Sequence, residues 1–133
     1  MKLSDYFEKT KGTGVLATAD ASGQVDAAIY ARPHFIDDQT VAFIMADRLS
    51  HLNLQSNLQA AYLFIEDGEG YTGKRLYLTK VAEESDPKKI AAMRRKSLPI
   101  GCQADDKPRY LVHFHIDTVR PLVGDSTEST AGE

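Results

Sequence analysis

Short apolar runs separated by turn-forming residues recur along most of the chain. Branched and aromatic residues dominate these runs, which is typical of β-strands. Six segments have this pattern: residues 13–19, 24–35, 40–46, 60–66, 74–84 and 109–117. Since most are joined by tight turns, such as the Asp-Ala-Ser-Gly at residues 20–23, we expect a mainly β fold. Its six antiparallel strands should close, or nearly close, into a small barrel.

Two segments favour short helices by their own pattern. Leu3, Tyr6 and Phe7 have the i, i+3, i+4 spacing of one helix face near the N-terminus. Asp86 and Pro87 form an N-cap followed by a proline at the first helical position, which predicts a helix through residue 96. A third helical pattern follows the strand at 40–46, so we expect two or three short helices in all.

The length and charge of the chain narrow the class of protein. A chain of 133 residues has the size of one domain, which we place at residues 1–123, and we expect the hydroxyl-rich residues 124–133 to form a flexible tail. No apolar run approaches the roughly 20 residues of a membrane span, and residues 1–12 lack the apolar core of a secretory signal. We therefore expect a cytoplasmic protein with no membrane contact. The net charge of -3 argues against nucleic acid as a partner.

Two histidines of the last strand raise the question of a metal. Period-two alternation places Tyr110, Val112, Phe114 and Ile116 on one face and His113, His115 and Asp117 on the other. Zinc or iron needs a third protein ligand, and nothing in the spacing brings His34 or His51 to the pair. We predict a solvated polar face and no metal.

Other charged clusters also have simple structural interpretations. Five basic residues on the helix at 86–96 either contact a phosphorylated ligand or RNA, or form a solvated face, and we favour the solvated face: Lys88, Lys89, Arg94, Arg95 and Lys96. The carboxylate pairs at 37–38, 83–84 and 105–106 are predicted to be solvated residues of turns or element ends. Cys102 has no activating base nearby, so we do not expect a nucleophile there.

The segment MADRLSHLNLQSN, residues 45–57, has two interpretations. As a helix start, Ser50 caps the amide of Asn53 while Leu49 and Leu54 form a hydrophobic staple. That interpretation leaves Arg48 unexplained, because it adds positive charge to the positive end of a helix. With His51 and the free amides of the first turn, Arg48 would give a phosphate donors from side chains and backbone together. On chemistry alone, both interpretations stay open.

The order of elements adds a further argument. The opening GVLATADASGQVDAA, the strand TVAFIMA, the helix beside a hydroxyl and a cation, and the returning strand AAYLF resemble the FMN-binding split-barrel family typified by pyridoxamine 5'-phosphate oxidase. The resemblance covers residues 8–120 approximately. It implies a six-stranded antiparallel split β-barrel that forms a homodimer, with FMN in the cleft between the subunits.

The resemblance also implies a set of cofactor-binding residues. The phosphate would be held at the strand-to-helix junction, which here has Arg48, Ser50 and His51, and either Ser50 or His51 takes the position where the family commonly has lysine. Two neighbouring strands would line the isoalloxazine ring, one with backbone groups of Ile44, Met45 and Ala46, and the other with Tyr30, Ala31 and Arg32. Arg32 would be a second cation near the phosphate or the flavin edge.

These expectations lead to one main functional hypothesis and two alternatives. The main one is a flavin-dependent oxidoreductase of unknown substrate, because the redox chemistry belongs to the cofactor and the protein orients it. We do not expect the pyridoxamine phosphate oxidase reaction itself, since residues 121–133 lack the substrate-binding segment of that enzyme. The alternatives are a barrel that binds haem, through His113 or His115, or a deazaflavin, and a binding domain without catalytic activity.

Overall fold

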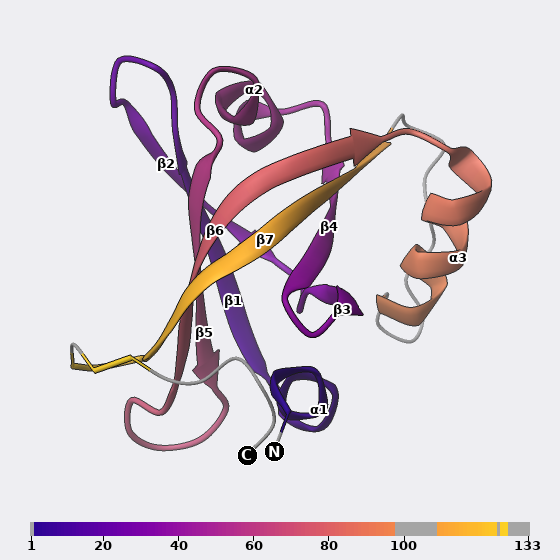
Figure 1. Ribbon diagram of the computed structural model, residues 1–133. Helices are drawn as coiled ribbons and strands as arrows, with labels where there is room; N and C mark the ends of the chain where they lie inside the picture. The colour runs from indigo at the N-terminus through magenta and orange to yellow at the C-terminus, as the bar shows by residue number, and fades with distance from the viewer. Residues whose placement is uncertain (1, 98–108, 125, 128–133) are drawn as a thin grey trace.

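The computed structural model describes residues 2–97, 109–124 and 126–127, with the backbone alone for residues 94–97. Its three helices and seven strands follow one another along the chain as shown in Figure 1: α1 (Leu3–Lys9), β1 (Gly12–Ala19), β2 (Val25–Tyr30), β3 (His34–Asp37), β4 (Thr40–Ala46), α2 (Leu49–Ser56), β5 (Gln59–Glu66), β6 (Gly73–Glu84), α3 (Pro87–Ser97) and β7 (Arg109–Pro121). The predictions for Cys102, for the carboxylate pair at 105–106, for the side chains of Arg94–Lys96 and for most of the tail lie outside the described residues.

All seven strands belong to one antiparallel sheet, in the order β2-β1-β5-β6-β7-β4-β3. We expected six strands that close, or nearly close, into a barrel, whereas the sheet has seven strands and is open. The predicted strand at 24–35 ends at Tyr30 and resumes at His34. Pro33, which has no amide hydrogen to give to a ladder, interrupts it between these residues.

This interruption determines the shape of the sheet. β2 and β3 are consecutive in the chain but lie at opposite edges of the sheet. Seven flat strands spaced about 4.8 Å apart would separate the two edges by roughly 29 Å, whereas the four Cα steps from Tyr30 to His34 span at most about 15 Å. The sheet therefore curls until its edges approach. In Figure 1, β2 and β4 converge behind β6 and β7, which lie in front.

The inner face of the curled sheet holds the main core. Alternate residues of each strand point inward, among them Leu16, Phe43, Tyr62 and Phe114, none of which exposes more than 2% of its surface. The ring of Tyr30 on β2 meets that of Phe43 on β4 edge-on, with centroids 6.0 Å apart. Side-chain packing thus joins strands that no backbone ladder connects. The predicted alternation on β7 is confirmed by the buried Val112, Phe114 and Ile116.

One glycine is required by this packing. An added Cβ at Gly14 would lie 1.8 Å from the hydroxyl oxygen of Tyr62. Tyr62 crosses this position because its hydroxyl donates to the backbone of the β2 end, with 3.1 Å to the carbonyl oxygen of Ala31 and 3.3 Å to that of Tyr30. The absence of a side chain at Gly14 therefore lets β5 anchor the end of β2.

The helices cover different parts of the sheet. Phe7 of α1 packs into the main core, and Ile90 of α3 forms a second, smaller cluster with Ala42 and Leu111. The predicted start of α3 is confirmed, since Pro87 is its first residue and Asp86 accepts a hydrogen bond from the amide of Lys88 at 3.0 Å. None of the helices in the described part of the chain is both long and apolar enough to cross a bilayer.

Candidate functional site

The junction between β4 and α2 differs from the predicted helix start. The N-cap is Arg48, the helix begins at Leu49, and the cap side chain makes no capping hydrogen bond. The prediction of Ser50 as N-cap is therefore wrong: the backbone turns earlier, with the Arg48 amide donating to the carbonyl of Ala46 at 2.9 Å. The predicted staple is wrong as well, because Leu49 is the first residue of the helix and not the residue before its N-cap.

Ser50 has a different role in the structure. Its side chain is 3% exposed and hydrogen-bonds the hydroxyl group of Tyr30 on β2. Burial raises the pKa of Tyr30, while the bond with Ser50 and the nearby charge of Arg48 act in the opposite direction. Tyr30 is thus a neutral phenol at physiological pH. Three of the predicted site residues, Tyr30, Arg48 and Ser50, come together at this junction.

The first turn of α2 has the features of an anion site. The leading amides of a helix have no partner within it, and the side-chain oxygen of a Ser, Thr, Asp or Asn N-cap commonly accepts a hydrogen bond from one of them. Here no acidic residue occupies the first turn, the first intrahelical bond runs from the Leu52 amide to the Arg48 carbonyl, and the cap residue is a cation. Backbone amides, the helix dipole and the Arg48 guanidinium therefore favour an anion at the same place.

His51 lies behind this first turn. Its side chain is 9% exposed and stacks on Tyr110 of β7, with ring centroids 3.9 Å apart and planes 9° from parallel. Its Nε2 lies 3.0 Å from an oxygen of Glu83 on β6, and its Nδ1 lies 3.5 Å from an oxygen of Asp47. The ring therefore makes contacts with its own fold at both nitrogens, and the structure does not bring it to the exposed side of the junction with Arg48.

Glu83 is the residue that sequence reasoning missed. The prediction of a solvated carboxylate is wrong, since the Glu83 side chain is 24% exposed and interacts with Lys80 at 2.8 Å, with Gln55 at 3.2 Å and with His51. Burial by itself would raise the pKa of Glu83, but the hydrogen bonds from Lys80, His51 and Gln55 outweigh it and lower this pKa to about 2. Glu83 is thus ionised at physiological pH, beside His51 and Gln55 of α2.

The remaining predicted residues lie elsewhere. Arg32 turns to the end of α1, where its guanidinium donates to the carbonyls of Phe7 at 2.9 Å and Thr10 at 3.1 Å. The side chain of Met45 is buried in the main core, and that of Ile44 packs against the α3 cluster. Ala46 is partly buried, and Ala31 is exposed.

The backbone of β4 offers another feature. β3 pairs with residues 40–42 only, so residues 43–46 have β7 on one side and no strand partner on the other among the described residues. This free edge includes Ile44, Met45 and Ala46 and leads directly to the junction at Arg48. Its backbone groups are therefore placed where a ligand held at the junction could be contacted.

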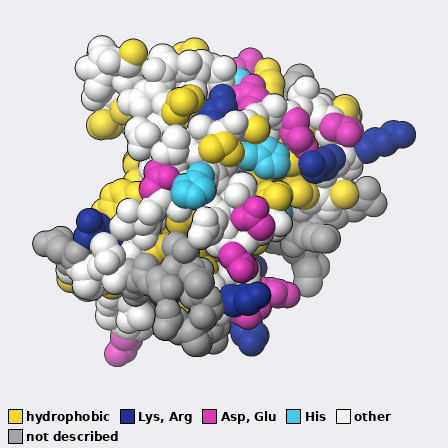
Figure 2. Space-filling view, viewed as in Figure 1, with side chains coloured by type: hydrophobic (Ala, Val, Ile, Leu, Met, Phe, Trp, Pro, Cys, Tyr) yellow, Lys and Arg dark blue, Asp and Glu magenta, His cyan; other side chains and the backbone are white. Residues whose placement is uncertain are grey.

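The predicted histidine face lies on the outside of the sheet. Figure 2 shows histidine and acidic side chains gathered on the face that β6 and β7 present to the viewer. His115 pairs with Asp117 at 2.9 Å, and the Nε2 of His113 lies 3.7 Å from an oxygen of Glu84. In residues 2–97, 109–124 and 126–127, no three His, Cys, Asp or Glu side chains form a group that would hold a metal ion.

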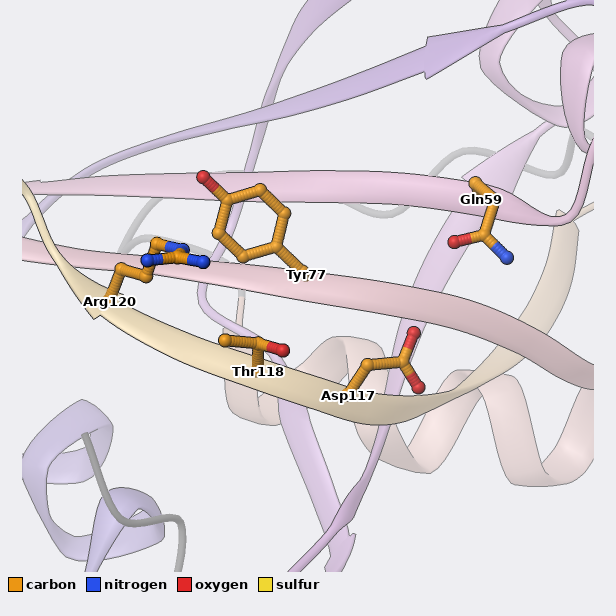
Figure 3. Close-up of a pocket in the computed structure, with 5 residues that line it drawn as sticks. All are labelled: Gln59, Tyr77, Asp117, Thr118 and Arg120. Carbon is orange, nitrogen blue, oxygen red and sulfur yellow. The ribbon is translucent and has the colours of Figure 1, made fainter. Parts of the chain in front are cut away.

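Two hollows lie away from the junction. One, of about 580 Å³, is lined by residues of β5, β6 and β7, and Figure 3 shows the Arg120 side chain extending toward the Tyr77 ring there. The guanidinium carbon lies 5.6 Å from the centre of that ring. The other, of about 380 Å³, lies between α1 and the 31–35 segment and includes Arg32, His34 and Met93. Neither contains a residue of the Arg48 junction.

Comparison with known proteins identifies the fold but gives no sequence family. No family model matches the chain, and no curated protein matches it. Among solved structures, an FMN-binding protein from Syntrophomonas wolfei is 16% identical, with 94% of this chain and 86% of that chain covered and a TM-score of 0.74. An F420 reductase is also 16% identical, with 87% and 94% covered and a TM-score of 0.66.

A third similar structure comes from Clostridium acetobutylicum. It is described as a protein of the pyridoxinephosphate oxidase family related to general stress protein 26, is 13% identical, covers 89% of this chain and 84% of its own, and has a TM-score of 0.61. These similarities extend over almost the whole chain at low identity, so they establish architecture. The curled sheet with α2 inserted after β4 is the fold of the FMN-binding split-barrel proteins.

Proposed function

We propose that this chain binds FMN, with the phosphoryl group at the β4–α2 junction, and acts as a flavin-dependent oxidoreductase of unidentified substrate. The observation that carries the proposal is the uncapped first turn of α2 beside Arg48, in a fold shared with an FMN-binding protein. A helix N-terminus with an adjacent guanidinium suits a phosphate dianion, because the amides and the cation act on the same charge.

Each residue at the junction has a definite role in this proposal. Arg48 pairs with the phosphoryl oxygens, and the amides of Leu49 and Ser50 donate to them. Tyr30 holds the Ser50 hydroxyl in place and keeps its own proton at Oη. The free edge of β4 at residues 43–46 supplies backbone donors and acceptors to the heterocycle. When bound, the flavin would supply hydride or single-electron transfer.

The proposal includes a homodimer. On the outer face of the sheet, cross-strand rows of apolar residues run from β2 through β1 to β5. Val15 lies between Ile29 and Leu63, and Ala17 lies between Ala27 and Ala61. Ile29 is 72% exposed, and Val25 on the same strand is 83% exposed. A contiguous exposed apolar face of this kind is typical of a protein interface, and a second copy of the chain would cover it.

Flavin titration tests the proposal. The purified protein is expected to show flavin absorbance, or to acquire it with micromolar FMN. Riboflavin lacks the phosphate, so the dissociation constant of riboflavin divided by that of FMN measures the contribution of the phosphoryl group to binding. Arg48→Ala should reduce that ratio about 10- to 100-fold, the value of one charge-assisted hydrogen bond at roughly 1.5–3 kcal/mol.

Two variants control this experiment. Lys11→Ala removes an equal charge from an exposed residue just before β1 and should leave the ratio unchanged. Arg48→Lys keeps the charge but loses the planar fork, and should give an intermediate ratio. A wild-type protein that binds neither FMN nor riboflavin at 100 µM refutes FMN as the cofactor.

A deazaflavin is the second candidate cofactor, favoured by the structural similarity to an F420 reductase. The two cofactors differ in absorption and fluorescence, so the spectrum of the untreated protein and parallel titrations with each distinguish them. Tighter binding of the deazaflavin than of FMN would mean that the same junction serves the deazaflavin instead of FMN.

A further inference from the structure

We propose that His51 is a positioning residue that keeps the first turn of α2 open to an anion by holding the Asp47 carboxylate away from it. This inference rests on the proposed function, because it concerns the same junction. It assigns a role to a contact between Asp47 and His51 that the phosphate site itself does not use.

The argument begins with what Asp47 would otherwise do. Aspartate is among the best N-cap residues, since its carboxylate accepts hydrogen bonds from first-turn amides. Asp47 lies one residue before the N-cap, and its side chain is 74% exposed, so it is free to move. If helix α2 began one residue earlier, Asp47 would become the N-cap and its carboxylate would occupy the position of the anion.

The structure shows a different partner for this carboxylate. Asp47 Oδ1 lies 3.5 Å from His51 Nδ1, one helical turn along, and Asp47 makes no capping bond to the first turn. The N-cap is Arg48, whose side chain cannot accept a hydrogen bond. Within the described residues, the amides of Leu49 and Ser50 therefore have no acidic cap.

His51 is held firmly enough to act in this way. Glu83 contacts its other nitrogen at 3.0 Å, and Tyr110 stacks on its ring at 3.9 Å. Glu83 is itself fixed by Lys80 at 2.8 Å and by Gln55 at 3.2 Å. The ring therefore lies between the two carboxylates, with Nε2 hydrogen-bonded to Glu83 and Nδ1 facing the exposed carboxylate of Asp47.

Two substitutions at position 51 separate the two contacts. In His51→Gln, the amide nitrogen reaches approximately the position of Nε2, which keeps the bond to Glu83 but leaves Asp47 without a partner. In His51→Asn, the amide nitrogen takes approximately the position of Nδ1, which keeps the Asp47 contact and loses that with Glu83. In the double variant Asp47→Ala/His51→Gln, the removal of Asp47 should abolish the effect of His51→Gln.

The test uses hydrogen exchange without ligand, followed by titration with inorganic phosphate and with FMN. In His51→Gln, the Leu49 and Ser50 amides should exchange more slowly, and affinity for phosphate and FMN should fall about three- to fivefold, the range of one exposed ion pair or cap. The double variant Asp47→Ala/His51→Gln should bind phosphate and FMN as tightly as Asp47→Ala does. His51→Asn should lose less of this affinity than His51→Gln. Riboflavin affinity should be unchanged throughout.

A matched control separates capping from simple charge. Asp67→Ala in the His51→Gln background removes an equal charge at an exposed turn next to the end of β5 and should restore nothing. Equal losses for FMN and riboflavin, unchanged amide exchange in His51→Gln, no rescue by Asp47→Ala, or no phosphate binding by the wild type would each overturn the inference. If phosphate binds as described but flavins do not, only the proposed function fails.

Discussion

The Nε2 of His51 lies 3.0 Å from the Oε2 of Glu83, a residue 32 positions further along the chain. This bond connects the first turn of α2 to the end of the long strand β6, and the stack of His51 on Tyr110 adds β7 to the same cluster. The start of α2 is therefore fixed by strands that are remote in sequence. Its stability should depend on the charge of Glu83.

Glu83→Gln should destabilise the protein in a pH-dependent way. The folded pKa of Glu83, about 2, is lower than the ordinary value of 4.5, so the ionised carboxylate contributes stability above pH 4.5. That contribution is lost as the pH falls from 4.5 toward 2, because the group then binds a proton in both states. Unfolding by urea at pH 7, 4 and 2.5 should show a difference between wild type and variant that shrinks at each step. A difference independent of pH would contradict this role of Glu83.

Arg32→Ala should weaken the fold without affecting phosphoryl binding. The guanidinium of Arg32 donates to the carbonyls of Phe7 and Thr10 at the C-terminal end of α1. Loss of these bonds should lower the free energy of unfolding by about 1–2 kcal/mol, measured by denaturant unfolding. The ratio of FMN to riboflavin affinity should stay at the wild-type value. A lower ratio would mean that Arg32 acts near the phosphate after all.

Thr18 and Asn53 form a buried pair that should respond unequally to single and double substitution. The amide of Asn53 donates to the Thr18 hydroxyl at 3.0 Å, and both side chains are less than 5% exposed. Thr18→Val alone should cost about 1–3 kcal/mol, because it leaves a buried donor unsatisfied. Thr18→Val with Asn53→Leu should cost less than the sum of the two single variants in a denaturant-unfolding cycle. Strict additivity would show that the pair is not coupled.

Ile29→Lys should disrupt the proposed dimer. Ile29 lies in the exposed apolar rows of β2, β1 and β5, where a charge would be buried in the interface of two copies. Light scattering should give twice the 14.7 kDa chain mass for the wild type and the single mass for the variant. Val123→Lys, at a residue that is 68% exposed beyond the end of β7, is the matched control and should remain dimeric. A monomeric wild type at 100 µM would remove the dimer from the proposal.

Local patterns predicted most elements but not their assembly. The strands at 13–19, 40–46, 60–66 and 74–84, and the helix start at Pro87, depend on side-chain alternation, turns and caps that lie within a few residues. The break at residues 31–33 was missed, although Pro33 was a visible signal for it. That the sheet has seven strands and stays open was not predictable, since strand pairing depends on contacts between remote segments.

At the site, the sequence drew attention to the correct segment and assigned some roles wrongly. Arg48 and Ser50 lie at the junction as expected, but Ser50 bonds to Tyr30 instead of capping the helix, and His51 turns inward to Glu83. Nothing in the local sequence distinguishes Glu83 from Glu84 beside it, which pairs with Lys89 at 2.8 Å instead of with His51. The difference arises from β6, whose alternation turns Glu83 toward the core face at the position of Val112.

The sequence by itself determined which segments become strands and helices and where cationic and hydroxyl side chains meet a helix start. These properties are local, because hydrogen bonding and side-chain alternation within a segment set them. Only the tertiary structure decided that the sheet stays open, that Arg32 serves α1, and that Glu83 holds His51 behind the junction. Each of these depends on which residues distant in the chain come within a few ångströms, and the packing of the whole sheet determines that.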